Sequence, residues 1–174
     1  MTMPVVTMLL SVGCLLGCQK STASKPVRLP VAPAAPQIHT EAQPRLPIIR
    51  LFIGAAEIET EQAIRPEHRE RGMMFRKTMG ENEAMIFVFQ QPQRLGFWMK
   101  NTTVPLSAAY IDSAGKVLEI HDLKPLDENP AQSISDRIQY VLEVPQGWFE
   151  RRQIKPGALI RTERGTLQET YFGN

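Results

Sequence analysis

The stretch Leu106–Leu123, LSAAYIDSAGKVLEIHDL, predicts two strands joined by a tight connection. The runs Leu106–Asp112 and Val117–Leu123 have β-like composition, and the residues between them end in Gly115, which accepts the positive φ that hairpin turns require. Apolar and polar residues alternate along the second run, as is typical of a strand with one face in water. This part of the chain therefore predicts an antiparallel hairpin.

Short β-like runs also occur on both sides of this hairpin. They are Ile48–Ile53, Ala55–Ala63, Met85–Phe89, Phe97–Thr102, Tyr140–Val144 and Ala158–Thr162. Short helices are expected from Pro66 to Arg71, where proline suits the first helical position, and over Trp148–Ile154, before Pro156-Gly157. Many short strands separated by turns favour a mainly β fold: a single β-sandwich or barrel-like domain with one or two short helices.

Composition excludes several classes of protein. The chain has 174 residues, of which 43% are hydrophobic and 22% charged, so collagenous, wholly disordered and polytopic membrane proteins are excluded. Its formal net charge is only +2, and like charges form no run. Nucleic-acid binding normally needs a basic patch, so we expect no nucleic-acid partner.

The N-terminal region has the pattern of an export signal. The apolar run Val5–Gly17 would span about 20 Å as a helix, less than the roughly 30 Å of a bilayer core. It ends in Leu15-Leu16-Gly17-Cys18, which resembles the lipobox of bacterial lipoproteins. We therefore expect residues 1–17 to be a lipoprotein signal peptide, with lipid attachment at Cys18. Cys14 is a poorer candidate, because Ser11 stands where leucine is preferred; a plain cleaved signal or a buried N-terminal helix is the alternative.

Lipidation would determine both the location and the redox chemistry of the protein. Several acyl chains, such as palmitate, anchor a protein durably, because each buried methylene contributes about 0.8 kcal/mol. Loss of Cys14 and modification of Cys18 would leave no free thiol for a disulfide, a nucleophile or a zinc site. We expect an envelope protein facing the periplasm, and Gln19 after the cysteine favours the outer over the inner membrane.

The segment after the lipidation site resembles a tether. Six prolines lie between Lys20 and Pro47, and such a composition favours extended conformers that build no core. We predict a lipidated, Pro-rich tether over residues 18–47, a β domain over 48–163 and a polar tail over 164–174.

Six motifs appear in one order along the predicted domain. They are RGMMFR (Arg71–Arg76), EAMIFVF (Glu83–Phe89), FWMKNTTVPL (Phe97–Leu106), EIHDLKPLDE (Glu119–Glu128), VLEVPQGWF (Val141–Phe149) and IKPG (Ile154–Gly157). Together they resemble the prokaryotic family called "domain of unknown function 192", particularly its exported or lipid-anchored members. The resemblance implies a compact, mainly β fold and no established reaction, cofactor or catalytic residue. Ser107 and Ala158 stand where the family usually has aspartate, which lowers the case for metal or acid–base chemistry.

The segment Phe97–Thr102 combines aromatic and polar residues. As a strand it would place Trp98 beside Lys100, a platform suited to a sugar ring or an anionic polymer. We therefore predict a ligand site formed by Arg76, Trp98, Lys100 and Asn101. The alternative is structural: Trp98 would cap the core, Lys100 would be solvated and Asn101 would satisfy backbone groups in a turn. Arg71 and Arg76 flank Gly72–Phe75, and either guanidinium could bind a carboxylate or phosphate or close an internal ion pair with Glu61 or Glu83, the role that we favour.

Two other kinds of activity remain open. A hydrolase of envelope polymers would use His121 with Glu119 or Asp127, although no Gly-x-Ser-x-Gly or HExxH motif is present. A copper-handling protein would use Met73, Met74, Met79, Met85 and Met99 with His68 or His121, but their irregular spacing among large apolar residues favours core filling. We assign no catalytic residue, metal ligand or cofactor. The expected function is a lipid-anchored, non-enzymatic module that binds a cell-wall glycan, a small ligand or an envelope protein.

Overall fold

The computed structural model describes residues 40–173, and these form a mainly β domain. The strands and helices are β1 (Ile48–Ile53), β2 (Ala56–Ala63), α1 (Pro66–Arg71), β3 (Glu83–Gln93), β4 (Gly96–Phe97), β5 (Leu106–Asp112), β6 (Val117–Leu123), β7 (Ala131–Gln132), β8 (Ile138–Pro145), α2 (Trp148–Arg151), β9 (Ile160–Thr162), β10 (Gly165–Thr166) and α3 (Leu167–Phe172). The predicted fold class is confirmed.

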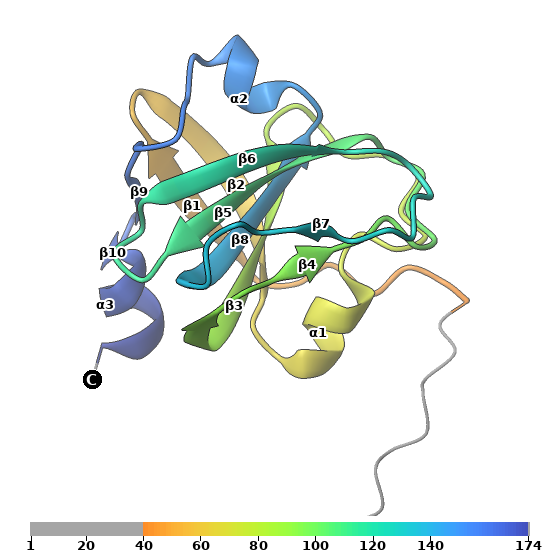
Figure 1. The fold of residues 1–174 in the computed structure, drawn as a ribbon, viewed down its shortest axis with the longest axis horizontal. Coiled ribbons are helices and arrows are strands. Elements are labelled where there is room, and N and C mark those ends of the chain that lie inside the picture. Colours follow the sequence, from red (N-terminus) through yellow and green to blue (C-terminus); the bar gives the residue numbers. More distant parts are fainter. Residues whose placement is uncertain (1–39, 174) are drawn as a thin grey trace, which may run out of the picture. The chain divides into compact units, whose positions relative to one another are not determined.

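Eight strands form one sheet in the order β10-β9-β1-β2-β3-β8-β5-β6, while β4 and β7 form a separate ribbon (Figure 1). The β1–β2 and β5–β6 pairs are antiparallel hairpins, and Gly54 and Gly115 take the positive φ of their turns. Strands β2 and β3 are parallel neighbours, since α1 and its following turn connect them. The sheet curves into a barrel-like form, because Lys116 at the start of β6 bridges to Leu159 before β9.

The large sheet buries apolar side chains on both faces. The inner core includes Leu51, Ile86 and Leu142 and is closed by Trp148 and Phe149 of α2. A second core on the opposite face includes Met85 and Tyr110. The β4–β7 ribbon covers this second face, with Phe97 packed edge-on against Phe87 and the Tyr110 hydroxyl donating to the carbonyl of Ala131. Strands β3, β5 and β8 therefore lie between two apolar layers.

Ordered packing continues beyond both predicted borders of the domain. Residues assigned to the tether pack on the domain: Leu46 is buried, and the buried Gln43 amide donates to the backbone carbonyls of His68 and Gly72. The predicted polar tail contains β10 and α3, whose Leu167 lies in the inner core. Thr166 begins α3 with a capping box to Glu169. The structured chain thus extends further at each end than the composition indicated.

The N-terminal predictions lie outside the described residues. The signal peptide, Cys18 and the tether as far as residue 39 are among them. Within residues 40–173, no helix has the length and apolar character needed to cross a membrane.

Candidate functional site

The segment 95–102 does not continue as the predicted strand. Strand β4 ends at Phe97, the Thr102 N–H turns back to the Met99 carbonyl, and Asn101 has a left-handed φ of 55°. Its carbonyl accepts a 2.7 Å bond from the Phe75 N–H, and the Met99 N–H bonds at 2.7 Å to Asp127. Asparagine tolerates this conformation better than most residues. The segment is therefore an ordered loop held by two neighbouring loops, and the prediction of a Phe97–Thr102 strand is wrong.

This loop forms one wall of a pocket, which we call the Glu143 pocket. The cavity has a volume of about 280 Å³. Its other walls come from α1 and the turn after it, from β3 and from β8. The residues that line it are Arg69, Glu70, Arg71, Gly72, Met73, Met74, Phe87, Phe89, Leu95, Gly96, Phe97, Trp98, Lys100, Thr102 and Glu143. Gly72 has a positive φ, and a Cβ there would meet the Phe87 ring at 3.2 Å, so this turn favours glycine.

Aromatic rings make up much of the pocket wall. Phe97 packs edge-on against Phe87 and Phe89, with ring centroids 4.8 and 6.5 Å apart. Trp98 is 45% exposed, while its neighbour Met99 is buried in the second core. Rings that are fixed on one side and open on the other offer an apolar surface to a ligand.

Three cations line the same pocket. Arg69 lies 4.9 Å from the Phe89 ring centroid and the Lys100 ammonium 5.2 Å from that of Trp98. Burial lowers the pKa of Arg69. Arg71 donates to the carbonyl of Glu41. Among residues 40–173, none of the three has an ion-pair partner within 4.0 Å.

Glu143 is the acidic group inside the pocket. It lies on β8 between Met85 of β3 and Ala108 of β5, and only 4% of its surface is exposed. Its Oε2 atom is buried without a hydrogen-bond partner among the described residues. Burial raises the pKa of Glu143 to about 8, so the carboxyl is mainly protonated at neutral pH.

The four predicted ligand residues do not form one site. Trp98 and Lys100 line the Glu143 pocket, whereas Arg76 and Asn101 do not. Asn101 serves the turn through its backbone. The structure therefore brings Trp98 and Lys100 together with Glu143 in this pocket.

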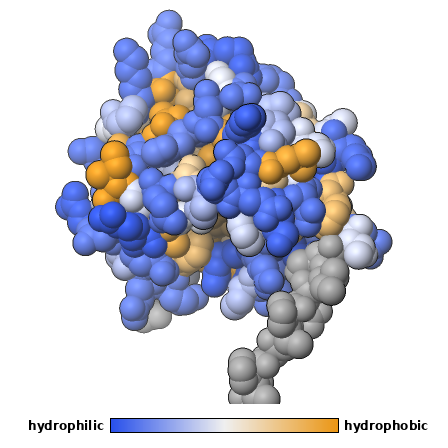
Figure 2. Space-filling view, turned by 45° about the vertical axis from the view of Figure 1, so that its right-hand side comes forward, coloured by the Kyte–Doolittle hydropathy of each residue, from blue (hydrophilic) through white to orange (hydrophobic). Residues whose placement is uncertain are grey.

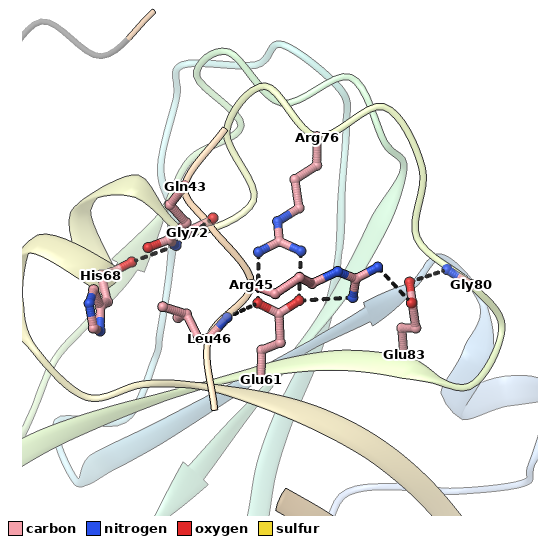
Figure 3. A network of polar contacts seen from close by, with 9 residues as sticks. All are labelled: Gln43, Arg45, Leu46, Glu61, His68, Gly72, Arg76, Gly80 and Glu83. Atoms are coloured by element: carbon pink, nitrogen blue, oxygen red, sulfur yellow. Dashed lines mark hydrogen bonds and ion pairs between the residues drawn. The ribbon is translucent and has the colours of Figure 1, made fainter. Parts of the chain in front are cut away.

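Arg76 has the internal role that we favoured. Its guanidinium, 10% exposed, binds the buried Glu61 carboxylate in a bidentate pair at 2.6 and 2.7 Å (Figure 3). Glu61 also accepts bonds from the Arg45 side chain at 3.0 Å and the Leu46 N–H at 2.8 Å. Arg45 continues to Glu83, which accepts the Gly80 N–H. This network ties the entering chain to β2, β3 and the loop that carries Arg76.

The predicted hydrolase residues have structural partners. Glu119 accepts the N–H groups of Ile134 and Ser135 at 2.9 and 2.8 Å, and its Oε2 lies 3.0 Å from His121 Nε2. Burial by itself would raise the pKa of Glu119, but these hydrogen bonds outweigh that effect and lower the pKa. Asp127 instead binds the N–H and amide of Asn129. Neither His121 nor Glu119 lines the Glu143 pocket.

The methionines proposed for copper lie mainly in apolar surroundings. Met73, Met85 and Met99 belong to the second core, and Met79 packs against it. Met74 is also buried. Among residues 40–173, no three His, Cys, Asp or Glu side chains are grouped as metal ligands. These positions are those of side chains that fill a core.

A second cavity, of about 710 Å³, lies between β6 and α2. Its wall includes Ser107, which donates to Asp122 and accepts the Gly147 N–H at 2.9 Å. The Ser107 hydroxyl thus acts as both donor and acceptor, and its two hydrogen bonds join β5 to β6 and to the start of α2. The serine that departs from the family pattern has a structural task here.

Sequence reasoning missed Glu143 and Arg69 as pocket residues, whereas Arg71 was considered as a group that binds an anion. Glu143 had one visible signal, since it is the only charged residue in the otherwise apolar run Tyr140–Val144. Arg69 gave no such signal, because only folding brings α1 beside β3 and the loop.

The fold and the pocket define a class: a small barrel-like β domain in which a ribbon and a short helix frame a cavity above a buried carboxyl. The chain belongs to the DUF192 family, because the family model described as "Uncharacterized ACR" matches residues 49–162. The comparison with curated proteins finds no match.

Two solved structures resemble the chain over most of their length. One is a candidate transcription regulator from Sinorhizobium meliloti 1021, with 28% identity, a TM-score of 0.66 and coverage of 70% of this chain and 98% of that one. The other is a protein of unknown function from Novosphingobium aromaticivorans DSM 12444, with 30% identity, a TM-score of 0.63 and coverage of 74% and 93%.

Proposed function

We propose that this protein is a lipid-anchored envelope module that binds a small ligand in the Glu143 pocket without transforming it. The observation that carries the proposal is the buried Glu143 side chain, which lines the pocket and whose Oε2 has no hydrogen-bond partner among the described residues. A ligand with a hydrogen-bond donor would supply the missing bond.

The unpartnered Glu143 carboxyl lowers the stability of the free protein. Burying a polar group without its hydrogen bond costs about 1–3 kcal/mol, and more when the group is charged. Met85 and Ala108, its neighbours on the adjoining strands, offer no side-chain polar group to offset this cost. A purely structural core would gain from an apolar residue here, whereas a binding site would gain specificity from the acid.

The size and lining of the pocket match a small ligand. A cavity of about 280 Å³ lies near the lower end of the usual range of ligand pockets, roughly 300–1,000 Å³. A single sugar ring or a compact amphipathic molecule suits aromatic walls with a few polar groups. The face drawn in Figure 2 is mainly hydrophilic with separate apolar patches, which suits binding at a confined pocket.

The anchor completes the proposal. The Leu15-Leu16-Gly17-Cys18 sequence supports lipidation at Cys18, and the Pro-rich segment after it supports a tether. Such an arrangement would hold the pocket near an envelope membrane, the outer one by our preference, within reach of cell-wall glycans, small molecules and envelope proteins. None of the described residues supplies an obvious catalytic set.

NMR titration of the full chain with a fixed probe panel tests the binding proposal. The panel is N-acetylglucosamine, N-acetylmuramic acid, glycyl-L-phenylalanine and 4-(aminomethyl)benzoate. At least one probe should shift the Trp98 indole N–H signal, and the same probe should lose that effect in Glu143→Gln and weaken in Trp98→Ala. The control, Glu59→Gln, changes an exposed carboxylate on β2 and should bind like the wild type. A panel that leaves the Trp98 signal in place, or acts equally on Glu143→Gln, would refute the proposal.

A further inference from the structure

Resting on the proposed function, we infer that the ligand of the Glu143 pocket is a small zwitterion with its charged groups at opposite ends. Its primary ammonium contacts Glu143, its apolar body lies between the aromatic rings, and its acid group meets Lys100 and the neighbouring arginines. The difference in burial between the pocket's deeply buried carboxyl and its three partly exposed cations carries this inference.

The buried end of the pocket selects a positive group. Glu143 is almost fully buried, and its Oε2 lacks a partner among residues 40–173. A neutral donor would satisfy one hydrogen bond. An ammonium would also favour ionisation of this carboxyl, which is mainly protonated in the free pocket at neutral pH, and the resulting charge-assisted bonds are roughly twice as strong as neutral ones. The closest fit at this end is therefore a compact, desolvated ammonium.

The open end selects a negative group. Lys100, Arg69 and Arg71 line the pocket without an ion-pair partner within 4.0 Å in the described part of the chain. Glu70, the other acidic residue of the wall, is exposed. The cations therefore outnumber the acids at the rim, and a carboxylate or a phosphate monoester would be bound there.

The middle of the pocket selects an apolar spacer. Phe87, Phe89 and Phe97 line the same pocket and are fixed by their edge-on packing, so they offer an apolar wall to the body of a ligand. A ring-sized body suits a cavity of about 280 Å³.

Three matched probes separate the parts of this inference. 4-(Aminomethyl)benzoate carries both charges across a ring, benzylamine carries only the ammonium, and 4-methylbenzoate carries only the acid. Calorimetric titration of the full chain should give tightest binding for the zwitterion, by about tenfold over either single-charge probe. 4-(Aminomethyl)phenyl phosphate, which keeps the ring and the ammonium but replaces the carboxylate by a phosphate monoester, then distinguishes a phosphate source from a carboxylate source.

Two variants assign the ends. Glu143→Gln should lower the affinity for the zwitterion and for benzylamine about tenfold and leave the affinity for 4-methylbenzoate unchanged. Lys100→Gln should lower the affinity for the zwitterion and for 4-methylbenzoate and leave the affinity for benzylamine unchanged. The loss should be only about threefold, because the Lys100 charge is only partly buried. Lys77→Gln, an exposed lysine outside the pocket, is the control. Glu143→Met provides a second variant of similar shape should Glu143→Gln fold poorly.

The outcomes separate this inference from the proposed function. Equal affinities for the zwitterion and a single-charge probe, or equal losses for all three probes in Glu143→Gln, would overturn the zwitterion. If a sugar of the panel binds in a Glu143-dependent way while the charged series does not bind, the inference fails and the proposed function stands. If nothing in either series binds, both fail.

Discussion

At the scale of single residues, Glu143 dominates the account. It occupies a position where the opposite strands supply Met85 and Ala108, so its carboxyl has lost water without gaining a described partner. Burial raises its pKa to about 8, whereas a glutamate in an unfolded chain titrates near 4.3. Tyr110, on the adjacent β5, also has a raised pKa, first through burial and then through the charge of Glu143.

This shift makes stability depend on pH in a defined direction. Below about pH 4.3 Glu143 is protonated in both states and imposes no penalty. Between about pH 4.3 and 8 the unfolded chain loses the proton that the folded chain keeps, so the free energy of unfolding falls by about 1.4 kcal/mol per pH unit. Above the folded pKa the loss is complete. Glu143→Gln should remove this slope and be more stable than the wild type at pH 8.

Urea unfolding at pH 5, 6.5 and 8 measures the effect. The difference between Glu143→Gln and the wild type should grow with pH, while Glu59→Gln, with its exposed side chain, should follow the wild type. Parallel pH profiles for Glu143→Gln and the wild type would show that the carboxyl is not buried as described.

Arg76 is the second informative residue, because it neutralises the buried Glu61. Removing one partner of a buried ion pair typically costs about 3–5 kcal/mol, since the other charge is left uncompensated. We expect Arg76→Ala to lower the free energy of unfolding by an amount near the lower end of this range, because Arg45 and the Leu46 N–H still contact Glu61. Chemical denaturation should show it.

Arg50→Ala is the matched control for Arg76→Ala. Arg50 pairs with Glu57 at 3.2 Å, but both side chains are about half exposed, so its loss should cost less than about 1 kcal/mol. Equal effects of the two substitutions would contradict the structural role of Arg76.

At the scale of elements, sequence pattern predicted strands where local composition and burial agree. The bounds of β1, β5 and β6 match their predicted ranges, and the β5–β6 turn lies at the expected Gly115. Strands β3 and β8 extend beyond the predicted runs into polar residues, because backbone pairing with neighbours continues there. Such pairing is a tertiary property that periodicity does not reveal.

The candidate site was less predictable than the strands. Trp98 and Lys100 were found as an aromatic–cationic pair, but the assumed strand geometry at Phe97–Thr102 was wrong, because long-range bonds to Phe75 and Asp127 shape a loop there. An internal ion pair of Arg76 with Glu61 or Glu83 was the favoured prediction, and the structure shows the pair with Glu61. The role of Glu143 depends on which segments cover its face of β8, and the sequence pattern does not specify those segments.

Helix α3 gives a prediction at this scale. Leu167 is buried in the inner core, and Tyr171 and Phe172 pack near the Tyr140 ring. Leu167→Ala should destabilise the domain by about 2–5 kcal/mol, the usual cost of removing a buried leucine side chain. Leu159→Ala, at a 58% exposed position, should change stability by less than about 0.5 kcal/mol. Thermal unfolding of both variants measures these changes. If Leu167→Ala left the stability nearly unchanged, α3 would not be packed on the domain as described.

At the scale of the whole molecule, the proposal combines a lipid anchor, a tether and a pocket. Lipidation at Cys18 should place the full chain in the membrane fraction and add the mass of a diacylglyceryl group and a further acyl chain. Cys18→Ser should abolish both effects, because a serine hydroxyl does not form the thioether. Cys14→Ser should retain them. Fractionation with intact-mass measurement checks the prediction, and an unmodified wild-type chain in the aqueous fraction would contradict it.

Ligand binding as proposed here depends on the buried Glu143 carboxyl, whose Oε2 has no hydrogen-bond partner among residues 40–173. A ¹³C NMR titration of the full chain with labelled glutamate, assigned through Glu143→Gln, follows this carboxyl. We expect a free-state pKa of about 8 for Glu143 and a lower value when 4-(aminomethyl)benzoate is present. A Glu143 that titrates near 4.3, or one whose pKa is the same with and without the probe, would contradict it.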